Sequence, residues 1–412
     1  MKTSIPDLPS GQSSLWLKSP PTESYPTLEQ DVDCDAVIIG GGITGLSIAY
    51  ALKQTGLKVV VLEKNTIGSG TTGGTTGKVT TQHGIIYDKI TKQFGTAKAQ
   101  TYATASQRAF DAMATLITDN RIACGWQRAD NYVYTANPKK VKQFEDEVAA
   151  ATALGLPASL ESNLALPFET VAAVKFTGQA MIDAYKYTKA LATLVDGGGS
   201  HVFENSNATG IHEGRPCTVK AGGHKVTAKN IIVATKVPAA PLVGRMTYAA
   251  MEFPLTSYLV AGTYEGNLQG MYISPDKQHY SLLPIQTEQG QMLLVGGQGH
   301  ITGLKRPKPQ QQKLAGYAQK WFGVEQIQYR WKAMDYVAYD NLPLIGKLYP
   351  WSEHTYFAGG LKKWGLNLSM VAAQVITELI HDTEPAAAKL FSPYRASAPA
   401  SIPLSIVRGF KH

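Results

Sequence analysis

Cysteine and charge are both scarce in this chain of 412 residues. The three cysteines, Cys34, Cys124 and Cys217, are far apart and odd in number, so they indicate neither a disulfide framework nor a metal-ligand spacing. Charged residues make up 17% of the chain and hydrophobic residues 44%, a balance typical of globular proteins rather than disordered ones. The sequence therefore predicts a folded protein of two or three domains without a metal site.

Long apolar runs and basic runs are also missing. No apolar stretch approaches the length of a membrane span, and residues 1–30 lack the apolar segment of a signal peptide. The formal charge of +8 comes from scattered Lys and Arg residues, which favours a solvated surface over a nucleic-acid partner. We therefore expect a cytoplasmic protein with no integral membrane segment and no nucleic-acid partner.

The most informative stretch present is Asp35 to Glu63, DAVIIGGGITGLSIAYALKQTGLKVVVLE, which predicts strand, turn, helix and strand. Gly40 permits a tight turn, Gly42 lets the main chain approach a pyrophosphate, and Gly45 lets the helix pack closely on the strand. The N–H groups at the helix start would face the phosphates of a dinucleotide. The contacts expected near this helix start and at the end of the second strand are Ile43, Thr44, Glu63 and Lys64.

Two chemical features refine this motif. The Glu63 carboxylate can accept hydrogen bonds from an adenosine ribose and would repel a ribose phosphate, which disfavours NADP. A loop rich in glycine and threonine, residues 68–84, follows directly, and we expect it to hold the second half of an extended cofactor rather than to be a flexible linker. The contacts expected in this loop are Gly70, Thr71, Thr72, Thr75, Thr76, Lys78, Val79 and Thr80.

The remaining elements follow from hydrophobic periodicity. One or two helices are predicted over residues 90–118, and single helices over 138–154, 185–195, 310–322 and after 359. Short strands are predicted over residues 201–204, 218–220, 225–227, 230–234 and 355–358. From 251 to 299, short alternating runs with aromatic residues and turn formers predict an antiparallel sheet, which would form the wall of a substrate pocket.

Together these segments resemble the FAD-dependent amine and amino-acid oxidoreductases of the D-amino-acid oxidase type, which include glycine oxidase and sarcosine oxidase. The likeness is greatest to a bacterial subgroup that often carries a Rieske iron–sulfur domain, and it covers residues 33–382. It rests on five segments in the family's order. They are the opening motif, the Thr/Gly loop, residues 204–211 (ENSNATGI), the strand end IIVAT at 231–235, and the pair 331–346 and 359–367.

The resemblance implies an α/β (α+β) fold with a Rossmann-type FAD-binding domain and an antiparallel-sheet substrate domain. The FAD-binding domain would comprise residues 31–115, 170–247 and 330–385, and the substrate domain residues 116–169 and 248–329. An N-terminal arm (1–30) anchored by Trp16 and a C-terminal tail (386–412) would complete the chain.

The resemblance also implies FAD contacts far from the opening motif. Ala208 would pack near the adenine, and Ala234 and Thr235 near the pyrophosphate. A helix start after Gly359 would bring N–H groups to the pyrimidine edge of the flavin, which suits the negative charge of a reduced flavin. The contacts expected there are Gly360, Lys363, Trp364, Gly365, Leu366 and Asn367. No Cys or His stands at the positions of covalent attachment, so we expect non-covalent FAD.

The substrate is predicted from a departure from the family pattern. Asp335 stands where members that bind an amino-acid carboxylate carry an arginine, so we expect an amine without an α-carboxylate at that site. Residues expected to be catalytic are Asp335, Tyr258, Tyr280 and Trp364, with Tyr336 as a further pocket residue. Asp335 could instead cap a turn or pair with Arg330 or Lys332, and each tyrosine could simply pack in the sheet.

The expected reaction is oxidation of a C–N bond of a small amine or amino acid by hydride transfer to FAD. No Cys-x-His and Cys-x-x-His pair occurs, so dioxygen or a separate electron acceptor would reoxidise the flavin. Two alternatives stay open: an NAD-dependent dehydrogenase, and a flavoprotein with a binding or electron-transfer role and no amine oxidase activity.

Overall fold

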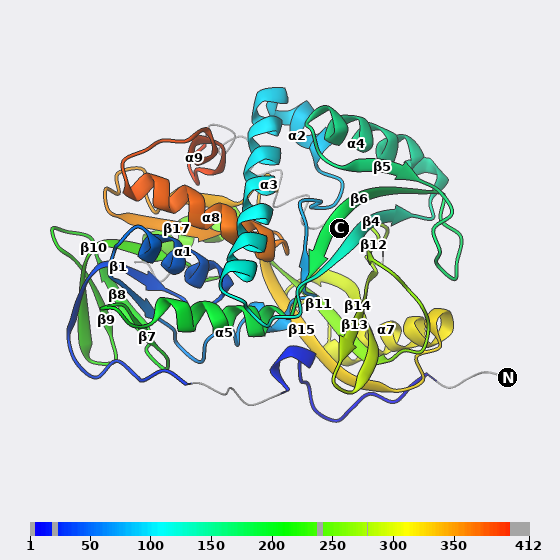
Figure 1. Cartoon of the computed structure of the whole chain (residues 1–412), viewed down its shortest axis with the longest axis horizontal. Coiled ribbons are helices and arrows are strands. Elements are labelled where there is room, and N and C mark those ends of the chain that lie inside the picture. Colours follow the sequence, from blue (N-terminus) through cyan, green and yellow to red (C-terminus); the bar gives the residue numbers. More distant parts are fainter. Residues whose placement is uncertain (1–4, 19–23, 237–241, 278, 396–412) are drawn as a thin grey trace.

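The computed structural model describes residues 5–18, 24–236, 242–277 and 279–395. Parts of the predicted arm (1–4 and 19–23) and of the predicted tail (396–412) lie outside the described residues. Within the described part, the strands form one sheet of eight strands and one of nine, and helices pack against both (Figure 1). This mixed architecture confirms the predicted α/β fold class.

The first sheet carries the predicted strand, turn, helix and strand. Its main path runs in the order β16-β17-β10-β1-β2-β7, and the β8–β9 hairpin extends it from β10. Neighbouring strands on this path are parallel except at the β16 edge. The strands are β1 (Val32–Ile39), β2 (Val59–Leu62), β7 (His201–Phe203), β8 (Ala208–His212), β9 (Cys217–Ala221), β10 (His224–Val233), β16 (Leu344–Lys347) and β17 (Thr355–Gly359).

The first sheet is buried on both faces. Successive residues of β1 point to opposite faces, and residues of both sets are buried. Ala36 and Ile38 pack into a cluster with the helices, whereas Val37 and Ile39 pack with Tyr248 and the β9 strand. The helices on the first face are α1 (Ile43–Gln54), α5 (Ala184–Val195) and α8 (Gly365–Ile380) (Figure 1). Burial on both faces explains why these strands read as continuous apolar runs.

The second sheet runs in the order β15-β11-β14-β13-β12-β4-β6-β3, with β5 beside β6. Its pairs are antiparallel except β12–β4, which confirms the antiparallel sheet predicted for residues 251–299. The strands are β3 (Lys78–Val79), β4 (Gln127–Thr135), β5 (Ala158–Glu161), β6 (Ala172–Met181), β11 (Glu252–Thr263), β12 (Met271–Ile273), β13 (Ser281–Thr287), β14 (Gly290–Ile301) and β15 (Ile327–Ala338).

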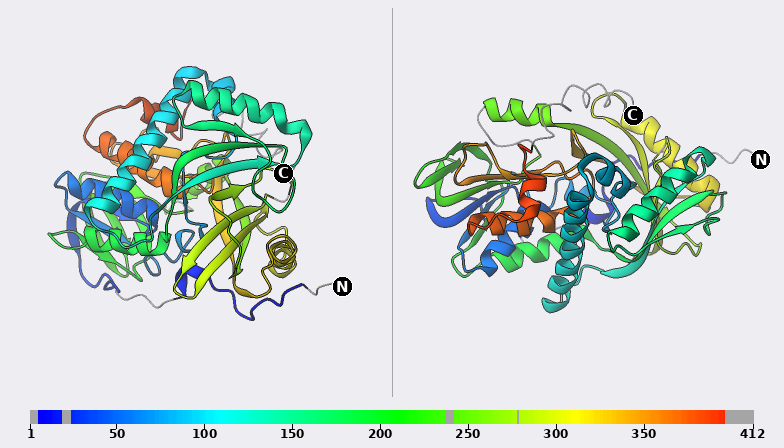
Figure 2. Two further views of the ribbon diagram at one scale, coloured as in Figure 1. Left: turned by 45° about the vertical axis from the view of Figure 1, so that its right-hand side comes forward. Right: turned by 90° about the horizontal axis from the view of Figure 1, so that it is seen from above.

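Further helices surround the second sheet and the junction. Helix α7 packs on the face of β11 and β14, and α3 stands upright between the two sheets (Figures 1 and 2). These helices are α2 (Tyr87–Phe94), α3 (Thr96–Asp119), α4 (Val141–Ala153), α6 (Leu242–Met251), α7 (Pro307–Phe322) and α9 (Ala386–Phe391). In the described part of the chain, no helix combines the length and the apolarity that crossing a membrane requires.

Some local predictions need correction. Of the one or two helices predicted over 90–118, the structure has two, α2 and α3, because the chain breaks at Gly95 with φ of 85°. Residues 225–227 and 230–234, predicted as separate strands, lie in one strand, β10, that ends at Val233. Residues 386–395 of the predicted tail are packed, since Phe391 and Arg395 are both buried.

The division of the chain into domains stays a prediction. Strands β3 and β6 and most of β15 fall within segments assigned to the FAD-binding domain, and all three strands belong to the second sheet. β15 pairs along its whole length with β11. An alternating strand pattern does not state which sheet the strand joins, because its partners are distant in sequence.

The N-terminal arm is fastened to the Thr/Gly loop. Trp16 is only 8% exposed, and its indole Nε1 donates to the carbonyl oxygen of Thr75 at 2.6 Å. The Ser14 hydroxyl donates to the carbonyl oxygen of Gly73. Trp16 is therefore an anchor, as predicted, and it holds the arm against the loop that we expect to contact FAD.

Candidate active site

The turn after β1 has the geometry that a pyrophosphate needs. Gly40 has φ of 113°, and a Cβ there would lie 2.8 Å from the carbonyl oxygen of Ala234. A Cβ on Gly45 would lie 1.9 Å from the carbonyl oxygen of Gly40, so the helix can approach the strand only without a side chain. Helix α1 starts at Ile43, and its N-cap residue Gly42 has no side chain to cap it. The Ile43 N–H donates to the Thr72 hydroxyl at 3.1 Å, so the other N–H groups of the first turn are the donors that could face an anion.

This turn opens into a cavity of about 1920 Å³ that extends to the second sheet. Typical small-molecule pockets occupy roughly 300–1,000 Å³, so there is room for an extended cofactor together with a substrate. Most residues predicted to contact FAD line this cavity. They are Gly40, Gly42, Ile43, Thr44, Glu63, Lys64, Gly70, Thr71, Thr72, Thr75, Thr76, Lys78, Ala208, Ala234, Thr235, Gly360, Lys363, Trp364, Gly365 and Leu366.

Four residues predicted as FAD contacts do not line the cavity but support its walls. Gly45 packs against the turn of Gly40, and Val79 is fully buried in the core. The Thr80 hydroxyl donates to Gln179 Oε1 at 2.9 Å. The Asn367 amide donates to the carbonyl oxygen of Ser106 at 3.0 Å. These contacts favour a structural role for each of the four.

Glu63 lies at the end of β2, as the motif predicts, and its carboxylate is already held by main-chain donors. Oε2 accepts from the N–H of Gly41 at 2.7 Å, and Oε1 accepts from the N–H of Asn65 at 2.9 Å. A carboxylate has about four lone-pair sites, so acceptor capacity is left for a ribose. The two N–H groups fix the orientation of the carboxylate at the rim of the cavity.

The geometry does not support a catalytic role for Tyr258 or Tyr280. The Tyr258 hydroxyl is hydrogen-bonded to His300 Nε2 at 2.8 Å, and its ring packs in the cluster that includes α7 residues. Tyr280 stacks on Tyr317 with ring centroids 3.6 Å apart. Ser257, Ser281 and Tyr258 all line the cavity, whereas Tyr280 does not. The ring of Tyr258 also belongs to the cluster with α7, and Tyr280 packs against that cluster.

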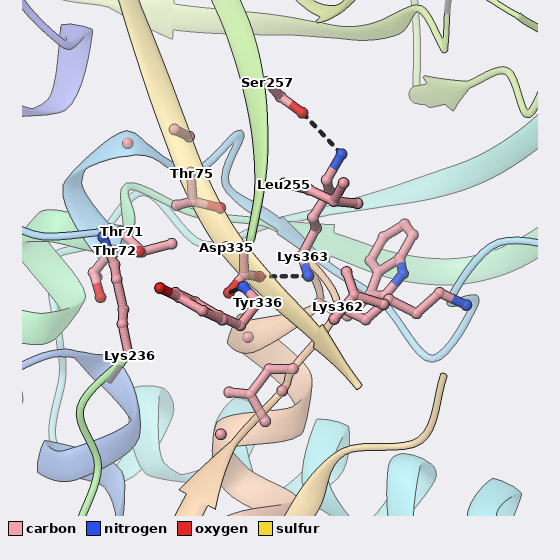
Figure 3. Close-up of a pocket in the computed structure, with 18 of the residues that line it drawn as sticks. Thr71, Thr72, Thr75, Lys236, Leu255, Ser257, Asp335, Tyr336, Lys362 and Lys363 are labelled. Atoms are coloured by element: carbon pink, nitrogen blue, oxygen red, sulfur yellow. Dashed lines mark hydrogen bonds between the residues drawn. The ribbon is translucent and has the colours of Figure 1, made fainter. Parts of the chain in front are cut away.

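Asp335 lines the cavity, but its carboxylate is bound to the main chain. It accepts hydrogen bonds from the N–H groups of Tyr336 at 2.8 Å and Lys363 at 2.5 Å (Figure 3). Burial raises the pKa of the Asp335 carboxyl above its usual value, although both hydrogen bonds oppose this shift. Neither Arg330 nor Lys332 forms an ion pair with Asp335 within the described residues. Of the alternatives, a cap on the turn at residues 362–363 fits best.

The turn at residues 362–363 contains Lys363, which was predicted to contact FAD, and Lys362, which was not predicted. Trp364, also predicted, follows it. Lys362 and Lys363 have φ of 50° and 67°, a strained conformation that the Asp335 contact helps to hold. Trp364 follows at the N-cap of α8 and its ring lies 5.4 Å from the ring of His83. Burial lowers the pKa of Lys362 to about 7, and the nearby Lys89 adds to the shift.

Sequence reasoning missed several residues that line the cavity. The strands of the second sheet contribute Ser257 and Ser281, and β14 contributes a run of glycines. Lys236, beyond the end of β10, also lines the cavity (Figure 3). The alternation of β11 was a usable signal for Ser257, but nothing local identified which face of that strand is hollow.

Comparison with known proteins agrees with this geometry. Residues 35–379 match the family described as DAO, FAD dependent oxidoreductase. This chain belongs to that family. FAD is therefore its cofactor and oxidation–reduction its chemistry. The close approach of the main chain at Gly40 and the size of the cavity fit this cofactor.

Two relatives in sequence are informative. A Bacillus subtilis (strain 168) protein named as a Rieske 2Fe-2S iron–sulfur protein, YhfW, is 34% identical over 385 residues, which cover 93% of this chain and 75% of YhfW. Gamma-glutamylputrescine oxidoreductase of Escherichia coli (strain K12) is 25% identical over 372 residues, covering 86% of this chain and 85% of that protein.

Solved structures show the same fold. Glycine oxidase from Geobacillus kaustophilus superposes with a TM-score of 0.72 at 19% identity, covering 86% of this chain and 96% of that one. L-proline dehydrogenase from P. horikoshii superposes with a TM-score of 0.73 at 20% identity, covering 89% of this chain and 98% of that one. At such low identity these structures establish the fold and nothing finer.

Proposed function

We propose that this protein oxidises a C–N bond of a small amine or amino acid, with bound FAD supplying the hydride acceptor. The observation that carries the proposal is the continuity of the cavity, which joins the bare turn at Gly40 to the inner face of the second sheet. A cofactor held at that turn can thus share one enclosure with a substrate. The family membership and the relative gamma-glutamylputrescine oxidoreductase support this chemistry.

The residues would hold the cofactor at three places. Donors at the start of α1 would bind the pyrophosphate, and the Thr/Gly loop would contact the middle of the cofactor. The N–H groups near Gly365, at the start of α8, would stabilise negative charge on the flavin's pyrimidine edge. These assignments, including non-covalent binding, stay predictions.

The second sheet would orient the substrate and exclude water. Leu255, Leu259 and Ile273 give the cavity an apolar lining on this side. Exclusion of water strengthens the electrostatic contacts inside the site. No dedicated base is required, because a neutral amine can lose hydride directly. Trp364 and Tyr336 stay candidates for substrate contact, whereas Asp335 would act by holding the turn at Lys363.

An anaerobic panel of amines and amino acids tests this function. Each compound is added to the purified flavoprotein without oxygen, and loss of the oxidised flavin absorbance is followed. At least one compound with a C–H bond next to nitrogen should bleach the flavin, and admission of air or an artificial acceptor should restore it. If no such compound bleaches a flavin that dithionite reduces normally, the binding or electron-transfer alternative replaces this proposal.

A further inference from the structure

Lys78 is a buried cation without an acidic partner in the described part of the chain. It is 5% exposed, and its Nζ donates to the carbonyl oxygen of Tyr272 at 2.5 Å and to the Ser281 hydroxyl at 2.7 Å. Both acceptors are neutral. An ammonium group has three donors, so one donor is left after these two contacts.

The position of this ammonium group is on the substrate side of the cavity. Tyr272 and Ser281 belong to β12 and β13 of the second sheet, whereas the turn at Gly40 belongs to the first. Ser281 pairs with Gly296 of β14, which in turn pairs with Leu259 of β11. Lys78 is thus placed beside the apolar lining that the proposed function assigns to the substrate.

The floor of the cavity beside Ser281 is hollowed by glycine. Gly296, Gly297 and Gly299 of β14 all line the cavity and carry no side chains into it. Near Gly299, at the other end of this glycine run, Lys363 Nζ donates to the Ser257 hydroxyl at 2.8 Å (Figure 3). A Cβ on Gly299 would lie 3.4 Å from Lys363 Nζ. The hollow therefore lies between two ammonium groups, each held by a serine of the same sheet.

A buried ammonium group is costly unless an anion approaches it. Burial is the cause of the lowered pKa of Lys78, about 7, and no carboxylate in the described residues opposes the shift. An anionic group entering the hollow would supply the missing charge and the third acceptor. Burial also lowers the pKa of Lys363, but there the carboxylate of Asp335 opposes the shift.

We propose that Lys78, positioned by Ser281, binds a carboxylate or similar anionic group of the substrate. Resting on the proposed function, this narrows the substrate to amines that also carry an acidic group. It replaces the expectation of an amine without a carboxylate, which we drew from Asp335.

The test uses the purified holoenzyme with benzoate as an anionic probe and benzamide as its neutral counterpart. Binding is followed as a perturbation of the flavin absorption spectrum, which requires no turnover. Lys78→Met should weaken benzoate binding about tenfold or more, the size expected for a hydrogen bond to a charged group. Benzamide binding should change little. Lys78→Arg should retain part of the affinity for benzoate, and Lys92→Met, on an exposed face of α2, should match the wild type.

Three results would overturn the proposal. Benzoate could bind Lys78→Met as tightly as it binds the wild type, or fail to perturb the wild-type flavin at all. Alternatively, Lys363→Met could abolish benzoate binding while Lys78→Met leaves it intact, which would assign the anion to the other ammonium group. If Lys78→Met loses FAD, Ser281→Ala decides instead, because it keeps the charge and should weaken benzoate binding several-fold.

The benzoate titration and the anaerobic amine panel can succeed or fail independently of each other. Lys78-dependent benzoate binding without bleaching by any amine would support the anion site and contradict C–N oxidation. Bleaching by neutral amines, with benzoate affinity independent of Lys78, would support the oxidation and contradict the anion site.

Discussion

The carboxylate of Asp335 on β15 accepts a hydrogen bond from the main-chain N–H of Lys363, 28 residues further along the chain. This contact joins the second sheet to the turn before α8, so it links the substrate side of the cavity to the segment expected at the flavin. It also places the Lys363 side chain where Nζ reaches Ser257 (Figure 3).

Asp335→Ala should weaken FAD binding and lower the free energy of unfolding by about 1–3 kcal/mol, because two main-chain donors lose their acceptor. Urea denaturation and FAD titration of the apoprotein measure the two effects. Lys332→Ala, at an exposed position on the same strand, is the matched control. An unchanged FAD affinity with a raised KM for amine would instead restore Asp335 as a substrate contact.

Gly45→Ala should prevent stable FAD binding, since the new Cβ would lie 1.9 Å from the carbonyl oxygen of Gly40 and force the helix away from the strand. The ratio of flavin to protein absorbance after purification reports the loss. Gly210→Ala is the control, because its Cβ would meet the Lys220 side chain at an ordinary 3.8 Å. Equal flavin content in both variants would contradict the packing role of Gly45.

Trp16→Phe removes the hydrogen bond from the indole Nε1 to Thr75 while keeping most of the buried ring. The Thr/Gly loop should loosen, and FAD should dissociate up to about tenfold faster, which corresponds to the net worth of one hydrogen bond. Stopped-flow release of flavin fluorescence measures the rate. Ile5→Ala, at a side chain that is 56% exposed, should leave it unchanged.

Binding of benzoate should weaken as pH rises through about 7, because Lys78 must be protonated to attract an anion and burial lowers its pKa to about 7. Stability should respond in the opposite direction. Between that value and the ordinary 10.5, the unfolded chain binds the proton that the folded chain has released, so this group makes the fold more stable as pH rises.

The matched variant isolates this titration. Lys362 also has a pKa of about 7, and Lys363, His83 and Asp335 are further titratable groups of the cavity. Their contributions cancel in the difference between the wild type and Lys78→Met. The benzoate affinities of the wild type and of Lys78→Met are compared between pH 6 and 9. If their ratio does not change with pH, the low pKa does not belong to Lys78.

Arg395→Met should lower the free energy of unfolding by about 3–5 kcal/mol, because it leaves the buried carboxylate of Asp340 without its cation. The Arg395 guanidinium also donates to the carbonyl oxygens of Leu342 and Pro343, which fixes the chain beside the cavity. Chemical denaturation measures the change, and Lys389→Met on the exposed side of α9 is the control. Equal stability of the two variants would show that the segment after 386 is a dispensable tail.

The sequence by itself determined the dinucleotide unit of this protein. Gly40, Gly42 and Gly45 act through neighbours within a few residues or on an adjacent strand, and the apolar runs on either side specify buried parallel strands. The composition of the Thr/Gly loop predicted its place at the cavity, but it did not predict that residues 78–83 are buried or that β3 pairs with β6. Trp16 was predictable as the largest apolar side chain in an arm rich in Pro, Ser and Thr.

Only the tertiary structure decided the substrate side. Which residues of β11 face the cavity depends on the register of this strand, because a shift of one residue exchanges its two faces. The contacts of Lys78 with Ser281 and of Asp335 with Lys363 join residues distant in sequence. No local pattern encodes such pairs, because they form when strands from separate segments pack into one sheet. The sequence thus established the cofactor, and the fold placed the charges that would select the substrate.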